Sequence, residues 1–134
     1  MAVTVMFHAG PGRIDGDLRA LCVTDHAECA QEYLYGGPGW LHVVEFDSAT
    51  RIAQESDILD ATESLGLTRT ADQIAGDWTD FFEAADREDV RAILTGQGYA
   101  GAEYLDTSPT GRTHRTILVW DTSVLTLTDT EAIA

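Results

Sequence analysis

The chain of 134 residues is 44% hydrophobic, which is enough for one compact domain spanning residues 1–134. Its 23 Asp and Glu residues outnumber its 8 basic residues, all of them Arg, so the formal net charge is -15. This charge repels phosphate groups, and we therefore expect neither nucleic acid nor an anionic membrane as a direct partner.

The first predicted strand is VTVMFH, residues 3–8, whose side chains alternate between two faces. It ends in the imidazole of His8, and the small residues Ala9 and Gly10 follow before a loop. No positively charged segment and no long apolar run precede His8, so the features of a signal peptide or a spanning helix are absent there. We expect a cytoplasmic protein.

A second strand is predicted at ALCVT, residues 20–24, and a helix follows it. Asp25, with Glu28 three residues later, matches a capping box and predicts the start of this helix. The helix extends to Leu34, and GGPG at 36–39 ends it.

Cys22 and Cys29 lie in this strand and helix. This placement suits a disulfide poorly, and in a reducing cytoplasm both should be free thiols. We expect neither to act as a nucleophile, because no neighbouring cation in the sequence would lower the thiol pKa.

The middle of the chain is predicted to be one strand followed by helices. The strand is WLHVVEFD, residues 40–47, and the first helix spans about residues 56–65 and closes at Gly66. A second helix opens with Thr70 and Gln73 and carries apolar residues as far as Ala85. Residues 87–95 form a third helix.

The last part of the chain predicts a hairpin and a final strand. AGAEYLD at 100–106 and TILVW at 116–120 flank the turn TSPTGR, and SVLTL at 123–127 is the final strand. Strands, helices and strands in this order predict an α+β fold with a mainly antiparallel sheet.

The string GQGYAG at 96–101 matches the dinucleotide pattern Gly-x-Gly-x-x-Gly, but it follows a predicted helix and precedes a predicted strand. A dinucleotide-binding fold needs the opposite order, so that the pyrophosphate meets the start of a helix. We interpret the string as the end of a helix and a tight turn. The four His residues are too scattered to predict a metal site.

Two segments resemble a known superfamily. FHAG at 7–10 and LCVTDHAECAQEY at 21–33 are similar to the first two signature regions of the ADP-ribosyltransferases, in the branch named after its His, Tyr and Glu residues. On that pattern His8 matches the His and Tyr33 the second Tyr, whereas Cys22 stands at the first Tyr and Thr116 at the Glu. The resemblance implies a split, mainly antiparallel sheet with flanking helices.

The missing Glu has two candidate replacements, Asp106 and Glu103. The chain is also similar to small phage anti-CRISPR ADP-ribosyltransferases, and that comparison favours Asp106 as the acid. The resemblance implies NAD as co-substrate and a protein acceptor for the ADP-ribose, with Asp106, His8 and Glu103 as catalytic candidates. The NAD-binding candidates are His8, Ala9, Gly10, Thr24, Asp25 and Tyr33.

The chemistry of these residues suits the implied reaction. Cleavage of the nicotinamide–ribose bond creates an oxocarbenium-like ribose, which a carboxylate stabilises. His8 can hold a ribose hydroxyl, the backbone amides around Ala9 and Gly10 can approach the carboxamide, and Tyr33 can stack on the ring.

Other functions remain open at this point. Cys22 and Thr116 differ from the Tyr and the Glu of the family pattern. These differences favour a non-catalytic, acidic interaction or inhibitor protein on the same fold. Plain NAD hydrolysis, or ADP-ribosylation of a small molecule, is a third hypothesis. The sequence determines neither the acceptor nor the oligomeric state.

Overall fold

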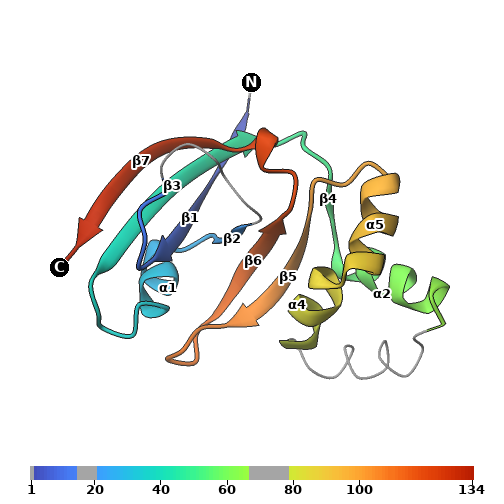
Figure 1. The fold of residues 1–134 in the computed structure, drawn as a ribbon, viewed down its shortest axis with the longest axis horizontal. Helices are drawn as coiled ribbons and strands as arrows, with labels where there is room; N and C mark the ends of the chain where they lie inside the picture. The colour runs from blue at the N-terminus through green and yellow to red at the C-terminus, as the bar shows by residue number, and fades with distance from the viewer. Residues whose placement is uncertain (1, 15–20, 67–78) are drawn as a thin grey trace.

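The structure, a computed structural model, describes residues 2–14, 21–66 and 79–134 (Figure 1). Within these ranges a seven-stranded sheet is accompanied by helices. The strands are β1 (Val3–Gly10), β2 (Leu21–Thr24), β3 (Gly39–Asp47), β4 (Ile52–Ala53), β5 (Gly101–Thr107), β6 (Thr113–Val119) and β7 (Thr126–Ile133). The helices are α1 (Ala27–Glu32), α2 (Glu55–Ser64), α4 (Thr79–Asp86), α5 (Glu88–Gly96) and a short 3₁₀ helix, η1 (Thr122–Val124).

The strand order in the sheet is β4-β5-β6-β2-β1-β3-β7. Every neighbouring pair is antiparallel except β4 with β5. The prediction of an α+β fold with a mainly antiparallel sheet is therefore confirmed. The short parallel strand β4 was not predicted, because two residues carry no readable alternation.

Backbone pairing is short near the centre of the sheet, between β1 and β2. These strands pair only where Phe7 lies opposite Thr24. On either side the pairing is long, since β1 pairs with β3 from Val3 to Gly10 and β2 pairs with β6 throughout. The two halves of the sheet thus diverge from the contact between Phe7 and Thr24.

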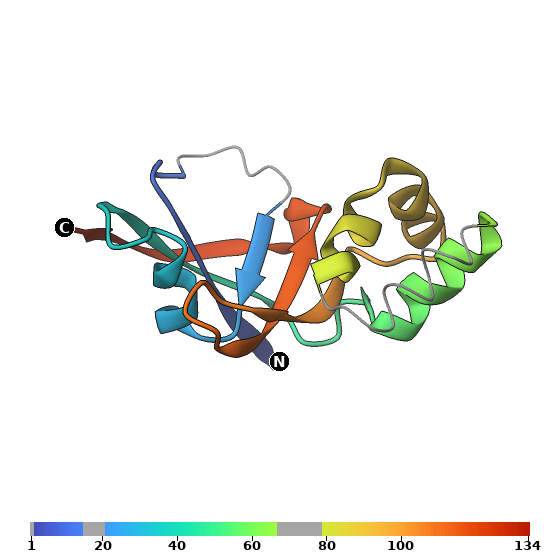
Figure 2. The ribbon, with the colours of Figure 1, turned by 90° about the horizontal axis from the view of Figure 1, so that it is seen from below.

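Two apolar cores stabilise the described part of the chain. The first lies where α2, α4 and α5 pack on β5 and β6, at one end of the molecule (Figure 2). Its fully buried members include Ile58, Val90 and Leu94. The second core lies on the other face of the sheet and is built around Met6, Val23, Val44, Phe46 and Ile117. Burial of this apolar surface is the main source of stability.

The start of α1 differs from the prediction. Its N-cap is His26, and no side chain caps the helix there, so the capping box of Asp25 and Glu28 was wrong. Asp25 instead uses its carboxylate to accept a hydrogen bond from the backbone N–H of Arg115, at 3.2 Å. Asp25 therefore forms a hydrogen bond to the strand β6 and does not cap α1.

The predicted helices after the third strand are confirmed where the structure describes them. The helix expected at 56–65 is α2, followed by Gly66 with φ of 74°. The helix expected at 87–95 is α5, and GQGYAG is a helix end and turn, with Gly98 at φ 89° before β5. The predicted helix opening at Thr70 lies partly outside the described residues, which resume at α4.

The hairpin of β5 and β6 is confirmed, but the final strand begins later than predicted. Ser123 belongs to η1. Its backbone N–H and its hydroxyl donate hydrogen bonds to the Asp121 carboxylate. This local cap holds the chain in a helical turn, so β7 starts only at Thr126 and pairs with β3.

Two further expectations concern residues in these elements. Cys22 and Cys29 are free thiols, as predicted. Among the described residues, none of the helices has the length and apolar character needed to cross a bilayer.

Candidate functional site

A pocket of about 370 Å³ opens where the two halves of the sheet diverge. It is lined by residues of β1, β2, β5 and β6, together with α1, the residue that follows α1, and α4. Segments that are distant in the sequence therefore meet at one cavity. Of the residues predicted from the sequence, those that line it are His8, Ala9, Thr24, Tyr33 and Asp106.

His8 spans the gap between the two diverging strands. Its Nδ1 lies 2.9 Å from the backbone carbonyl of Cys22, which can only accept a hydrogen bond. Nδ1 is therefore the protonated nitrogen of the neutral ring, and Nε2 keeps a lone pair. A Cβ atom at residue 10 would lie 3.4 Å from Nε2, so Gly10 keeps the space next to this nitrogen open.

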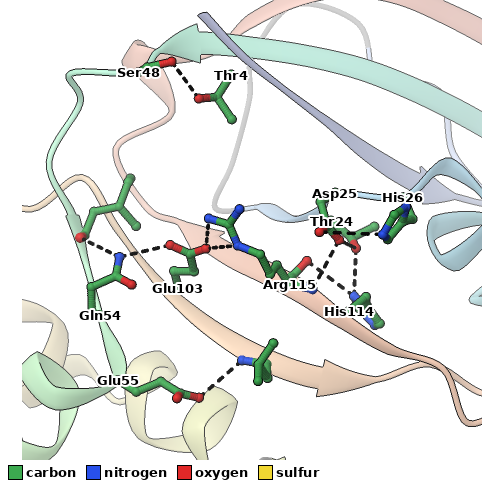
Figure 3. A network of polar contacts seen from close by, with 12 residues as sticks. Thr4, Thr24, Asp25, His26, Ser48, Gln54, Glu55, Glu103, His114 and Arg115 are labelled. Atoms are coloured by element: carbon green, nitrogen blue, oxygen red, sulfur yellow. Dashed lines mark hydrogen bonds and ion pairs between the residues drawn. The ribbon is translucent and has the colours of Figure 1, made fainter.

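Three predicted site residues do not line the pocket: Gly10, Asp25 and Glu103. Gly10 lies beside His8, and the Asp25 carboxylate is bound to the Arg115 backbone. Glu103 lies opposite Ile117 in the β5–β6 ladder, which places it on the face of the second core. There it pairs with the Arg115 side chain and accepts a hydrogen bond from Gln54 at 3.0 Å (Figure 3).

Asp106 is the carboxylate that the structure brings into the pocket. It pairs directly with His114 across the hairpin, so the two side chains share one face of the sheet. Its Oδ1 accepts a hydrogen bond from the backbone N–H of Thr107 at 2.8 Å, which holds the carboxylate at the end of β5. The remaining lone pairs of the carboxylate can serve a ligand.

His114 also lines the pocket, although it was not predicted as a site residue. Its side chain is 3% exposed and is hydrogen-bonded at both nitrogens. Nδ1 lies 2.7 Å from the Thr24 hydroxyl (Figure 3) and 3.1 Å from that of Thr116, whereas Nε2 lies 3.1 Å from the Tyr33 hydroxyl. The available signal was its place two residues before Thr116, on the same face of a strand.

Tyr33 lies at the C-terminal end of α1, where it is 40% exposed. Its ring meets the His114 ring edge-on, with the centroids 6.0 Å apart. Desolvation by burial, followed by the negative charge of Asp106, raises the pKa of Tyr33 from 10.0 to about 12. The phenol is therefore neutral at physiological pH, and its ring forms part of the pocket wall.

The inner wall of the pocket holds Cys22 and Tyr104. Burial raises the pKa of the Cys22 thiol to about 11, so the thiol is protonated and unreactive at neutral pH. Burial also raises the pKa of Tyr104, whose buried hydroxyl has no hydrogen-bond partner among the described residues. Both side chains are uncharged at neutral pH, so this inner wall of the pocket carries no charge.

Glu32, the residue before Tyr33, connects α1 to the turn between β5 and β6 through hydrogen bonds. The Glu32 carboxylate accepts hydrogen bonds from the Ser108 hydroxyl at 2.9 Å and from the backbone N–H and hydroxyl of Thr110. Arg112 approaches it at 3.8 Å. The Thr110 hydroxyl bond is the main cause that lowers the pKa of Glu32. This contact, which we call the Glu32 latch, keeps Tyr33 close to His114.

The described residues of the site present one carboxylate, two imidazoles and one accessible phenol around a mostly apolar cavity. Such a set can orient hydroxyl groups and stabilise positive charge. Within residues 2–14, 21–66 and 79–134, no Arg lines the pocket, and no group of three or more side chains is suited to hold a metal ion. No family model, curated protein or solved structure matches this chain.

Proposed function

We propose that the protein binds NAD in this pocket, cleaves its nicotinamide–ribose bond and transfers ADP-ribose to a protein acceptor. The observation that carries the proposal is the convergence of His8, Tyr33 and Asp106 on one cavity from three separate parts of the chain. Each has the chemistry that a pyridinium riboside requires.

The size and polarity of the pocket support the proposal. A volume of about 370 Å³ lies in the range of small-ligand sites and can hold a ring together with a sugar. Tyr33 and Phe82 supply aromatic surface for the ring. The acceptor groups of His8 and Asp106 suit the ribose hydroxyls.

The reaction needs little proton transfer at its first step. Nicotinamide leaves as a neutral molecule, so no general acid is required. The positive charge then lies on the ribose, where the Asp106 carboxylate would stabilise it electrostatically. The acceptor attacks the anomeric carbon and loses a proton, which completes the transfer.

A specific observation favours a second candidate, a non-catalytic interaction protein. Thr116 stands where the resemblance places the catalytic Glu, and its hydroxyl is buried against His114. On this second hypothesis the net charge of -15 directs the protein to a basic partner surface. Hydrolysis of NAD, or transfer to a small molecule, is a variant of the first candidate in which no protein is modified.

The test is an assay of nicotinamide release from NAD with the purified protein, alone and with a cell lysate. NAD labelled in the adenosine part reports transfer in the same samples. Release with a labelled protein supports the proposal, and release without one points to hydrolysis or a small acceptor. Absence of release under both conditions would favour the interaction protein. An ADP-ribosylating phage or toxin effector is the biological role that fits the first result.

A further inference from the structure

The hydrogen-bond directions around the pocket can be assigned from the partners of each group. At His8, the carbonyl of Cys22 takes the Nδ1 proton at 2.9 Å. Nε2 of the neutral ring is consequently an acceptor. The proton of this side chain therefore points to the strand backbone and leaves no donor for a ligand.

The same reasoning applies to His114. The carbonyl of Arg115, which can only accept, lies 3.4 Å from Nδ1. The Thr24 hydroxyl donates to Asp25 Oδ1 at 3.5 Å, so its oxygen is free to accept from Nδ1 at 2.7 Å. Nδ1 also lies 3.1 Å from the Thr116 hydroxyl, so a proton on Nδ1 of the neutral imidazole would meet only oxygen atoms that can accept it. We assign the proton to Nδ1 on this basis, which leaves Nε2 as an acceptor.

The direction of the Tyr33 hydroxyl follows from that of His114. Because Nε2 has no proton, the bond of 3.1 Å is donated by the Tyr33 hydroxyl. The lone pairs of the phenol oxygen then remain for a ligand. Asp106 adds a carboxylate, which only accepts, and its negative charge also disfavours ionisation of Tyr33.

We propose that His114 is a positioning residue that fixes Tyr33 as a hydrogen-bond acceptor, so that the pocket selects a cationic ligand rich in hydrogen-bond donors. The acceptors are His8 Nε2, the Tyr33 oxygen and the Asp106 carboxylate. The inference deepens the proposed function and rests on it for the choice of probe. A hydroxylated pyridinium belongs to the selected class, and a neutral ring with the same hydroxyls does not.

The first experiment determines the tautomers of the histidines in the ligand-free protein. A long-range ¹H–¹⁵N spectrum distinguishes protonated from unprotonated imidazole nitrogens. The expected result at neutral pH is a proton on Nδ1 and a hydrogen-bonded, unprotonated Nε2 at His114. Tyr33→Phe should shift the His114 Nε2 resonance towards that of a nitrogen without a donor, while Nδ1 changes little. A proton on His114 Nε2 would overturn the inference.

The second experiment compares two ligands by NMR titration. Nicotinamide riboside is a hydroxylated cation, and its dihydro form is neutral with the same hydroxyl groups. The cation should bind about 10-fold more tightly or better, because its positive charge meets the Asp106 carboxylate in the pocket wall. Tyr33→Phe should weaken binding of nicotinamide riboside by about 3-fold to 10-fold through the lost acceptor. Equal binding of the two ligands overturns the inference.

Tyr35→Phe is the matched control, because Tyr35 lies two residues away and is 80% exposed. It should change neither the His114 spectrum nor the binding of nicotinamide riboside. If Tyr33→Phe and Tyr35→Phe changed the spectrum and the binding equally, the effect would come from the stability of the fold. This result would overturn the positioning role. Nicotinamide release from NAD is measured separately. Selective binding without release contradicts the proposed function alone, whereas release with equal binding contradicts this inference alone.

Discussion

Asp106 and His114 lie directly opposite each other across the β5–β6 ladder, and both side chains line the pocket. One hairpin therefore supplies the negative charge of the site and also the imidazole that holds Tyr33. Because antiparallel pairs keep opposed side chains on one face, the register of this hairpin determines the site geometry. A change in that register would separate the two groups.

The role of the carboxylate can be tested with Asp106→Asn, which keeps the shape and removes the charge. Turnover should fall by about 10²-fold or more, as for the loss of a positioned electrostatic group. Affinity for NAD should fall less, because the contact strengthens as positive charge moves from the ring to the ribose. Nicotinamide release and NAD titration measure the two quantities.

Glu103→Gln is the control for that experiment, because Glu103 lies on the opposite face and pairs with Arg115. It should leave turnover unchanged. Inactivity of Glu103→Gln together with an active Asp106→Asn would show that the wrong carboxylate has been assigned. An Asp106→Asn variant with full activity and lower thermal stability would indicate a purely structural role.

The Glu32 latch should make stability depend on acid pH. The pKa of Glu32 is lowered in the folded state, so its contribution is present above the unfolded pKa and is lost as pH falls through the folded pKa. Glu32→Gln should therefore be less stable than the wild type at about pH 7, and the difference should shrink towards about pH 3. Urea unfolding at both pH values measures this difference.

Glu28→Gln provides the comparison, since Glu28 is an exposed carboxylate on the same helix. The latch assignment fails if both variants lose the same stability at neutral pH. It also fails if the deficit of Glu32→Gln is as large in acid as at neutral pH.

The thiol of Cys22 should be inert despite its place in the pocket wall. With a pKa of about 11, it is almost entirely protonated at about pH 8 and should react slowly with iodoacetamide. Its alkylation rate should rise as the pH approaches the thiol pKa. Cys22→Ser should retain most of any turnover, whereas rapid labelling at neutral pH with loss of activity would point to thiol chemistry.

Gly101 should be required for the close approach of β5 and β6. A Cβ atom there would lie 2.6 Å from the backbone carbonyl oxygen of Leu118, which cannot move without disturbing the ladder. Gly101→Ala should cost about 1–3 kcal/mol of unfolding free energy, as other overpacked sites do. Denaturant unfolding gives this quantity directly.

Gly96→Ala is the counterpart, because a Cβ at the end of α5 would meet nothing within 4 Å. This variant should be neutral or more stable by about 0.5–1 kcal/mol, since Ala favours the helix over Gly. The steric explanation would be rejected if the two substitutions had equal effects.

Most of the local structure could be predicted from residues that are neighbours in the chain. Alternation in residues 3–8 and the strand-forming residues of 40–47 predicted two strands, and the hairpin of residues 100–120 was recognisable from its turn. The order of elements around GQGYAG also excluded a dinucleotide-binding turn. These features depend on residues close together in the chain, which is why their pattern is readable.

Parts of the site could be predicted for the same reason. His8 and Asp106 were predicted at strand ends, and both line the pocket, although β1 continues past His8 to Gly10 and β5 continues to Thr107. The spacing of Glu103 and Asp106 places them on opposite faces of one strand. Which of these faces meets the pocket was not decided by that spacing.

The remaining features of the site depend on contacts between distant parts of the chain. His114 acquires its role from Thr24 and Tyr33, which are 90 and 81 positions away in the sequence. Asp25 was predicted to cap a helix, but pairing of β2 with β6 brings the Arg115 backbone within reach of its carboxylate. The choice between Glu103 and Asp106 followed from the packing of α2, α4 and α5 on one face of the hairpin. Contacts of this kind depend on how distant segments pack, and local patterns contain no information about that packing.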